Sequence, residues 1–93
     1  MLTGGSSDYY KIYIANPTSV DEPYTAECND NIEALNMPFG LGNVFKAAWR
    51  LAALIQGHGK PGATRTYDAE KIVFFGNREL LKAKAHDGIS SKI

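Results

Sequence analysis

The chain has 93 residues and a mass of 10.2 kDa, which is enough for one domain. Apolar residues make up 44% and charged residues 22%, so the chain is too apolar to be disordered. Ten basic side chains balance ten acidic ones, which argues against a protein that grips long nucleic acid through its phosphates. The single cysteine, Cys28, excludes an intramolecular disulfide.

We expect one helical domain over residues 9–85, between a flexible lead-in at 1–8 and a frayed tail at 86–93. The N-terminus lacks the basic start and apolar core of a signal peptide. No apolar run approaches the ~18–20 residues of a membrane span. These features predict a cytoplasmic protein with no membrane association.

Residues 9–15 have the pattern of a short strand, because Ile12 and Ile14 alternate with more polar residues. A single strand must pair with a symmetry mate, join a partner's sheet, or lie against the helices as an extended arm. This is the main reason to expect a homo-oligomer. The candidate interface residues are Tyr9, Tyr10 and Tyr13.

The periodicity predicts a first helix over residues 25–36, with Thr25 as its N-cap and Cys28 on its apolar face. Pro38 and Gly40 end it. The second helix, over 41–56, is apolar nearly all round and should be central. Its polar side chains share one stripe roughly 60° wide. They are Asn43, Lys46 and Arg50.

A third helix is predicted over residues 68–85, with Asp68 as its N-cap and Gly76 at a kink or a close contact. Four large aromatic residues are expected in the core, in preference to a role as platforms on which bases stack. These are Phe45, Trp49, Phe74 and Phe75. The fold class is therefore mainly α, a three-helix domain preceded by a short N-terminal β-strand or extended arm.

The polar stripe on the second helix has two interpretations. Two cations and an amide on one face can hold a phosphate or a carboxylate. They can equally form an internal ion-pair network with acidic residues of the other helices. The candidate carboxylates are Glu27, Asp30 and Asp68. If the cations and the carboxylates do not touch, the gap between them suits a magnesium ion with a bound phosphate.

Residues 57–66 form a basic, glycine-rich loop that either wraps a phosphate or simply connects two helices. The chain has neither the GxxxxGK[ST] phosphate loop nor a GxGxxG after a strand. One cysteine and two distant histidines do not predict a metal site.

Residues 27–35 (ECNDNIEAL) and 39–50 (FGLGNVFKAAWR) resemble a small helical phage family of unknown function, some of whose members are described as nucleotide kinases. The likeness rests mainly on the motif G-N-x-x-K-x-x-W-R. Residues 67–71 and 74–78 are similar to a third segment of that family. The extra asparagines beside Asp30, the glycine at 76 and the longer loop depart from its pattern.

The resemblance implies a phage or prophage protein in the cytoplasm of its bacterial host, with a nucleotide-related site. The residues that match are Asn43, Lys46, Arg50, Asp30, Asp68, Lys71 and Arg78. Kinase activity is not general to the family, and three short helices offer little wall around a transferring phosphoryl group.

We therefore expect a protein that binds a nucleotide or another phosphate-bearing small molecule, and binding is favoured over catalysis. Magnesium is expected only if the ligand is a nucleotide. The alternative is a non-enzymatic phage effector of the anti-defence type, which occupies a host protein or sequesters a signalling nucleotide.

Overall fold

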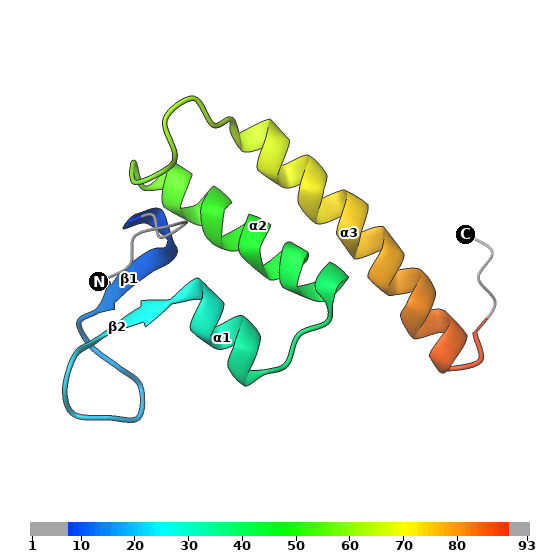
Figure 1. Ribbon diagram of the computed structural model, residues 1–93, viewed down its shortest axis with the longest axis horizontal. Helices are drawn as coiled ribbons and strands as arrows, with labels where there is room; N and C mark the ends of the chain where they lie inside the picture. Colours follow the sequence, from blue (N-terminus) through cyan, green and yellow to red (C-terminus); the bar gives the residue numbers. More distant parts are fainter. Residues whose placement is uncertain (1–7, 90–93) are drawn as a thin grey trace.

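The computed structural model describes residues 8–89, which form three helices and a small sheet (Figure 1). The elements are η1 (Asp8–Tyr10), β1 (Lys11–Ile14), β2 (Tyr24–Glu27), α1 (Cys28–Ala34), α2 (Phe39–Ile55) and α3 (Arg65–His86). The prediction of a mainly α, three-helix domain with a short N-terminal strand is confirmed. Residues 1–7 of the expected lead-in and 90–93 of the expected tail lie outside the described residues.

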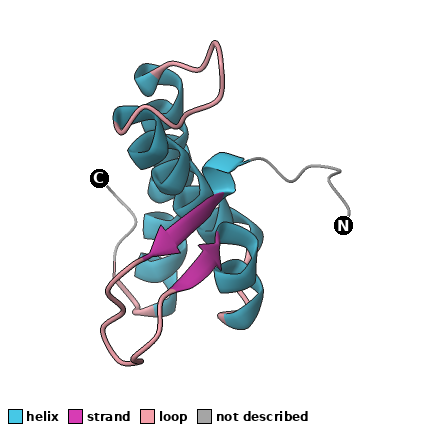
Figure 2. Cartoon of the chain, turned by 90° about the vertical axis from the view of Figure 1, so that its left-hand side faces the viewer, coloured by secondary structure: helices cyan, strands magenta, loops and turns pink. Residues whose placement is uncertain are grey.

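The two strands pair with each other inside one chain. β1 and β2 are antiparallel, with Lys11 opposite Glu27 and Ile14 opposite Tyr24. Figure 2 shows the two strands side by side, joined by the long loop 15–23. The strand at 9–15 therefore has its partner in its own chain, and the expectation that it needs another subunit or the helices is wrong.

The start of the first helix also differs from the prediction. Thr25 does not cap a helix, because it lies in β2 opposite Tyr13. The helix begins at Cys28, after Glu27 in an extended conformation. Aromatic and β-branched residues at 24–25 favour a strand once β1 lies beside them. Cys28 is buried, as predicted, with 3% of its surface exposed.

α2 is the central helix, as predicted, and lies between α1 and α3 (Figure 1). Its buried residues are small: Gly40, Gly42, Ala47 and Ala53. Small side chains let the neighbouring helices come close. The helix begins at Phe39, earlier than predicted, because Pro38 already has the extended backbone angles of an N-cap.

α3 begins three residues before the predicted start. Thr64, not Asp68, is its N-cap, and the Thr64 side chain accepts a hydrogen bond of 3.1 Å from the backbone N–H of Tyr67. Asp68 is thereby placed inside the first turn. The helix continues through Gly76, and apart from its two neighbours and the backbone of its own helix no described atom lies within 4 Å of a Cβ built there. The expected close contact at Gly76 is therefore wrong.

The aromatic residues do not all reach the core. Phe45, Trp49 and Phe75 are half-buried, and Trp49 Nε1 donates a hydrogen bond of 2.8 Å to the carbonyl oxygen of Tyr9. Phe74 is 58% exposed, so its assignment to the core is wrong. The reason is topological: α3 packs along α2 on one side only, which leaves its outer side uncovered within residues 8–89 (Figure 1).

Candidate functional site

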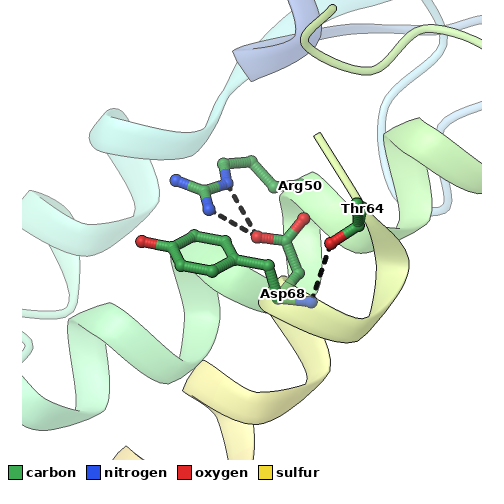
Figure 3. A network of polar contacts seen from close by, with 4 residues as sticks. Arg50, Thr64 and Asp68 are labelled. Carbon is green, nitrogen blue, oxygen red and sulfur yellow. Dashed lines mark hydrogen bonds and ion pairs between the residues drawn. The ribbon is translucent and has the colours of Figure 1, made fainter. Parts of the chain in front are cut away.

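The first turn of α3 brings Asp68 against Arg50 of α2 (Figure 3). Arg50 Nε donates to Asp68 Oδ1 at 3.1 Å, and Arg50 Nη2 donates to the same oxygen. The Asp68 side chain is 1% exposed and that of Arg50 18%. Asp68 Oδ2 is buried and has no hydrogen-bond partner within the described part of the chain. One of the expected internal ion pairs is therefore present.

The ion pair uses two of the three nitrogens of the Arg50 guanidinium. Figure 3 shows its third nitrogen pointing away from Asp68. Burial opposes the charged form of Arg50, but hydrogen bonding and charge interactions with Tyr10 and Asp68 outweigh it and raise the pKa of Arg50. Arg50 is thus a cation held in place by Tyr10 and Asp68.

The side chains of Arg50 and Lys71 both lie near the ring of Tyr67, which is one helical turn before Lys71 in α3. Arg50 Cζ is 5.8 Å and Lys71 Nζ 5.4 Å from the ring centroid. The Tyr67 side chain is still about half exposed. An aromatic face next to two cations is a surface on which a planar, anionic ligand can stack.

A second aromatic–cation contact lies where η1 meets α2. Lys46 Nζ is 5.5 Å from the ring centroid of Tyr10. Burial raises the pKa of the Tyr10 hydroxyl, although Arg50 beside it acts in the opposite direction. Tyr10 therefore stays protonated at neutral pH and lies near both cations of the predicted stripe.

A cavity of about 430 Å³ opens between the end of α2 and the start of α3. Its lining combines a guanidinium, an ammonium, an aromatic ring and the backbone of a glycine-containing loop. The lining residues are Arg50, Lys60, Pro61, Gly62, Ala63, Thr64 and Tyr67. A volume of this size is in the range of small-molecule sites.

The structure gathers only part of the predicted site. Arg50 and Lys71 lie near the Tyr67 ring, and Asp68 pairs with Arg50. Arg78 lies ten residues beyond Asp68, about 15 Å along the helix. Asn43 donates a hydrogen bond of 2.8 Å from its side-chain amide to the backbone oxygen of Phe39, which uses one of its two N–H donors inside α2. Asp30 is exposed on α1, and no ion pair joins it to a cation of residues 8–89.

The tyrosines expected at an interface have different environments. Tyr13 is 65% exposed, so its side chain can contact a partner. Tyr9 and Tyr10 are half-buried against α2 of their own chain, through the Trp49 hydrogen bond and the Lys46 contact. The aromatic pattern alone does not separate these two situations.

Three residues of the cavity do not stand out individually in the sequence. Lys60 and Thr64 belong to a loop whose composition suits a phosphate loop and a plain connector equally well. Tyr67 directly precedes the N-cap predicted at Asp68, where no side-chain role is expected. Its signal is the four-residue spacing to Lys71, which places the two side chains on one helix face.

In residues 8–89, no three histidine, cysteine, aspartate or glutamate side chains gather in a way that would hold a metal ion. None of the helices in this range combines the length and apolarity that a membrane crossing requires. Comparisons of the chain with family models, curated proteins and solved structures gave no match.

Proposed function

We propose that this protein binds a phosphate-bearing small molecule, with a mononucleotide as the best fit, in the cavity between the 56–64 loop and the first turn of α3. The observation that carries the proposal is the lining itself. Two cations and a half-exposed aromatic ring line the same cavity: Arg50, Lys60 and Tyr67.

The charges around the cavity favour an anion. Asp68 neutralises the charge of Arg50, but its carboxylate is buried and presents little negative surface to the cavity. Lys60 is exposed in the loop, and Lys71 adds a further positive charge beside the Tyr67 ring. The N-terminal end of a 22-residue helix adds partial positive charge at the same place.

The aromatic ring favours a nucleotide over a simple phosphate. Base-on-aromatic stacking contributes about 1–3 kcal/mol, and a tyrosine between cations tolerates any base. The phosphates would then contact Lys60, Arg50 and the loop N–H groups. Binding without turnover fits best, because three helices enclose too little of a transferring phosphoryl group to exclude water from it. Phage origin, a cytoplasmic location and a role in nucleotide metabolism or anti-defence belong to this same proposal.

The test is a thermal-shift and calorimetry screen with nucleoside mono-, di- and triphosphates, cyclic oligonucleotides and inorganic phosphate, each with and without magnesium. A ligand at 100 times its dissociation constant adds ~2.7 kcal/mol, and each kcal/mol raises the Tm of a domain this size by about 4–8 °C. A shift with mononucleotides supports the proposal. A shift with cyclic species alone redirects it to sequestration of a signalling nucleotide.

The variant Lys60→Gln should weaken binding by about tenfold or more, since a charge-assisted contact contributes about 1.5–3 kcal/mol. Lys82→Gln is the matched control: it removes the same charge from the far end of α3, where Lys82 pairs with Glu79 on the surface. Absence of a shift with every phosphate compound, or equal affinity of the Lys60 variant and the wild type, refutes the proposal.

A further inference from the structure

Few apolar side chains of the described range are fully buried. Only Cys28, Ala47 and Ala53 are buried among the apolar residues of 8–89. Large apolar side chains of α2 and α3, and Leu35 after α1, are instead 40% exposed or more. They include Leu35, Phe39, Leu41, Val73, Phe74, Leu80 and Leu81. A domain of this size has a small margin of stability, so an apolar surface this extensive needs cover.

Three phenylalanines concentrate this surface where the start of α2 meets the middle of α3. Phe75 makes edge-on contacts with Phe39 and with Phe74, at centroid distances of 5.9 and 5.0 Å. Phe39 is 79% exposed and Phe74 58%. We call Phe39, Phe74 and Phe75 the phenylalanine cluster.

Opposite charges lie on either side of Phe74 along α3. Glu70 is four residues before Phe74 and Arg78 four residues after it, so the three side chains form one ridge of the helix. Both charged side chains are exposed. Neither forms an ion pair with another residue of the described range.

We propose that a second copy of this chain packs on the phenylalanine cluster, with the two α3 helices antiparallel around a two-fold axis at Phe74. Glu70 of each subunit then lies opposite Arg78 of the partner subunit, and the two-fold axis makes this pair twice. Phe74 packs on its symmetry mate, and Phe39 is covered at the edge of the interface.

The equal spacing of Glu70 and Arg78 on either side of Phe74 favours a second copy of the chain as the partner, and not an unrelated protein. A two-fold interface is self-complementary, so a charge on one side of the axis must meet its opposite at the same distance on the other side. Glu70 and Arg78 meet this condition around Phe74. The interface also differs from the one predicted from the N-terminal tyrosines, since β1 has its partner within the chain. It does not depend on ligand binding.

The first test is the mass of the ligand-free protein by sedimentation over a concentration series at low salt. We expect twice the 10.2 kDa of the chain. Phe74→Ser should give the mass of a single chain and an unchanged circular dichroism spectrum, because the side chain is already largely exposed in the monomer.

The second test is a charge exchange. Glu70→Arg places two arginines opposite each other, and Arg78→Glu places two glutamates opposite each other. Each single variant should raise the dimer dissociation constant by about tenfold or more, and the double variant Glu70→Arg/Arg78→Glu should restore it. Glu22→Arg, an exposed charge reversal in the 15–23 loop, is the control and should leave the mass unchanged.

A wild-type protein that sediments as a single chain at all concentrations overturns the proposal. So does a dimer whose dissociation constant is insensitive to both single reversals, or a double variant that is no better than the singles. Because no nucleotide is present, these outcomes are independent of the outcome of the ligand screen.

Discussion

Arg50 of α2 and Asp68 of α3 are joined by two hydrogen bonds to one carboxylate oxygen, across 18 residues of sequence. This contact joins the first turn of α3 to α2, and Asp68 is the most deeply buried charged side chain among the described residues. Arg50 is also one of the residues that line the cavity. The same pair therefore serves the fold and the candidate site.

The first prediction concerns the free energy of unfolding of this ion pair. Arg50→Met leaves the buried Asp68 carboxylate without its partner and should cost about 3–5 kcal/mol. Asp68→Asn keeps the shape and should cost about 1.5–3 kcal/mol. The double variant should cost less than the sum, since it leaves no uncompensated buried charge. Urea unfolding of the four proteins measures this coupling, and strict additivity would contradict it.

The second prediction tests whether the Tyr67 ring contacts the base of the nucleotide and not its phosphate. Tyr67→Ala removes the ring beside Arg50 and Lys71 and should weaken nucleotide binding by about 5-fold to 100-fold. Tyr67→Phe keeps the ring and should bind nearly as well as the wild type. Inorganic phosphate should bind all three proteins alike. Calorimetry measures the affinities, and an equal loss for phosphate and nucleotide would show that Tyr67 does not contact the base.

The third prediction concerns the thiol of Cys28. Burial raises the pKa of Cys28, and the positive charge of Lys46 opposes this only in part. At pH 8 the native protein should react with a thiol reagent at least about tenfold more slowly than the protein unfolded in urea, because the thiolate is the reactive species. A fast reaction under native conditions would show that the helix start opens readily.

The same thiol makes stability depend on alkaline pH. Its folded-state pKa is raised, so above the unfolded-state pKa of about 8.5 the folded state binds more protons than the unfolded state. The Cys28 contribution is therefore constant below that pH and declines as pH rises through it. Urea midpoints should fall as the pH rises from neutral past the unfolded-state pKa in the wild type, and should fall less in Cys28→Ala.

The fourth prediction uses two glycines, one inside the outer helix and one just after its C-terminal end. At Gly76, inside α3, an added methyl group would meet no described atom within 4 Å, so Gly76→Ala should stabilise the protein by about 0.5–1 kcal/mol. Gly88 has a φ of +73°, so Gly88→Ala should destabilise it. Thermal unfolding measures both, and a lower Tm for Gly76→Ala would indicate a packing role that the described residues do not show.

The helices themselves are largely predictable from the sequence. The apolar pattern locates α2 within two or three residues of its start, and Pro38 marks the break before it. The error at α1 has a local cause: Thr25 suits an N-cap and a strand equally well. β1, more than ten residues upstream, decides between the two by pairing with it.

The candidate site is predictable only as a set of alternatives. Helical spacing places Lys46 and Arg50 on one face of α2, with several acidic residues of the other helices as candidate partners. Which cation meets which carboxylate depends on the path of the 56–64 loop and on the start of α3 at Arg65. One turn of difference at that start is enough to turn Asp68 from a cap into the buried partner of Arg50.

The sequence by itself determined the class of the fold, the central position of α2 and the burial of Cys28, because helical periodicity and apolar faces are properties of neighbouring residues. Only the tertiary structure decided that β1 pairs within the chain, that Arg50 meets Asp68, that Tyr67 and Lys60 line one cavity, and that Phe74 remains exposed. Each of these depends on how distant segments lie against each other, and local patterns do not specify that arrangement.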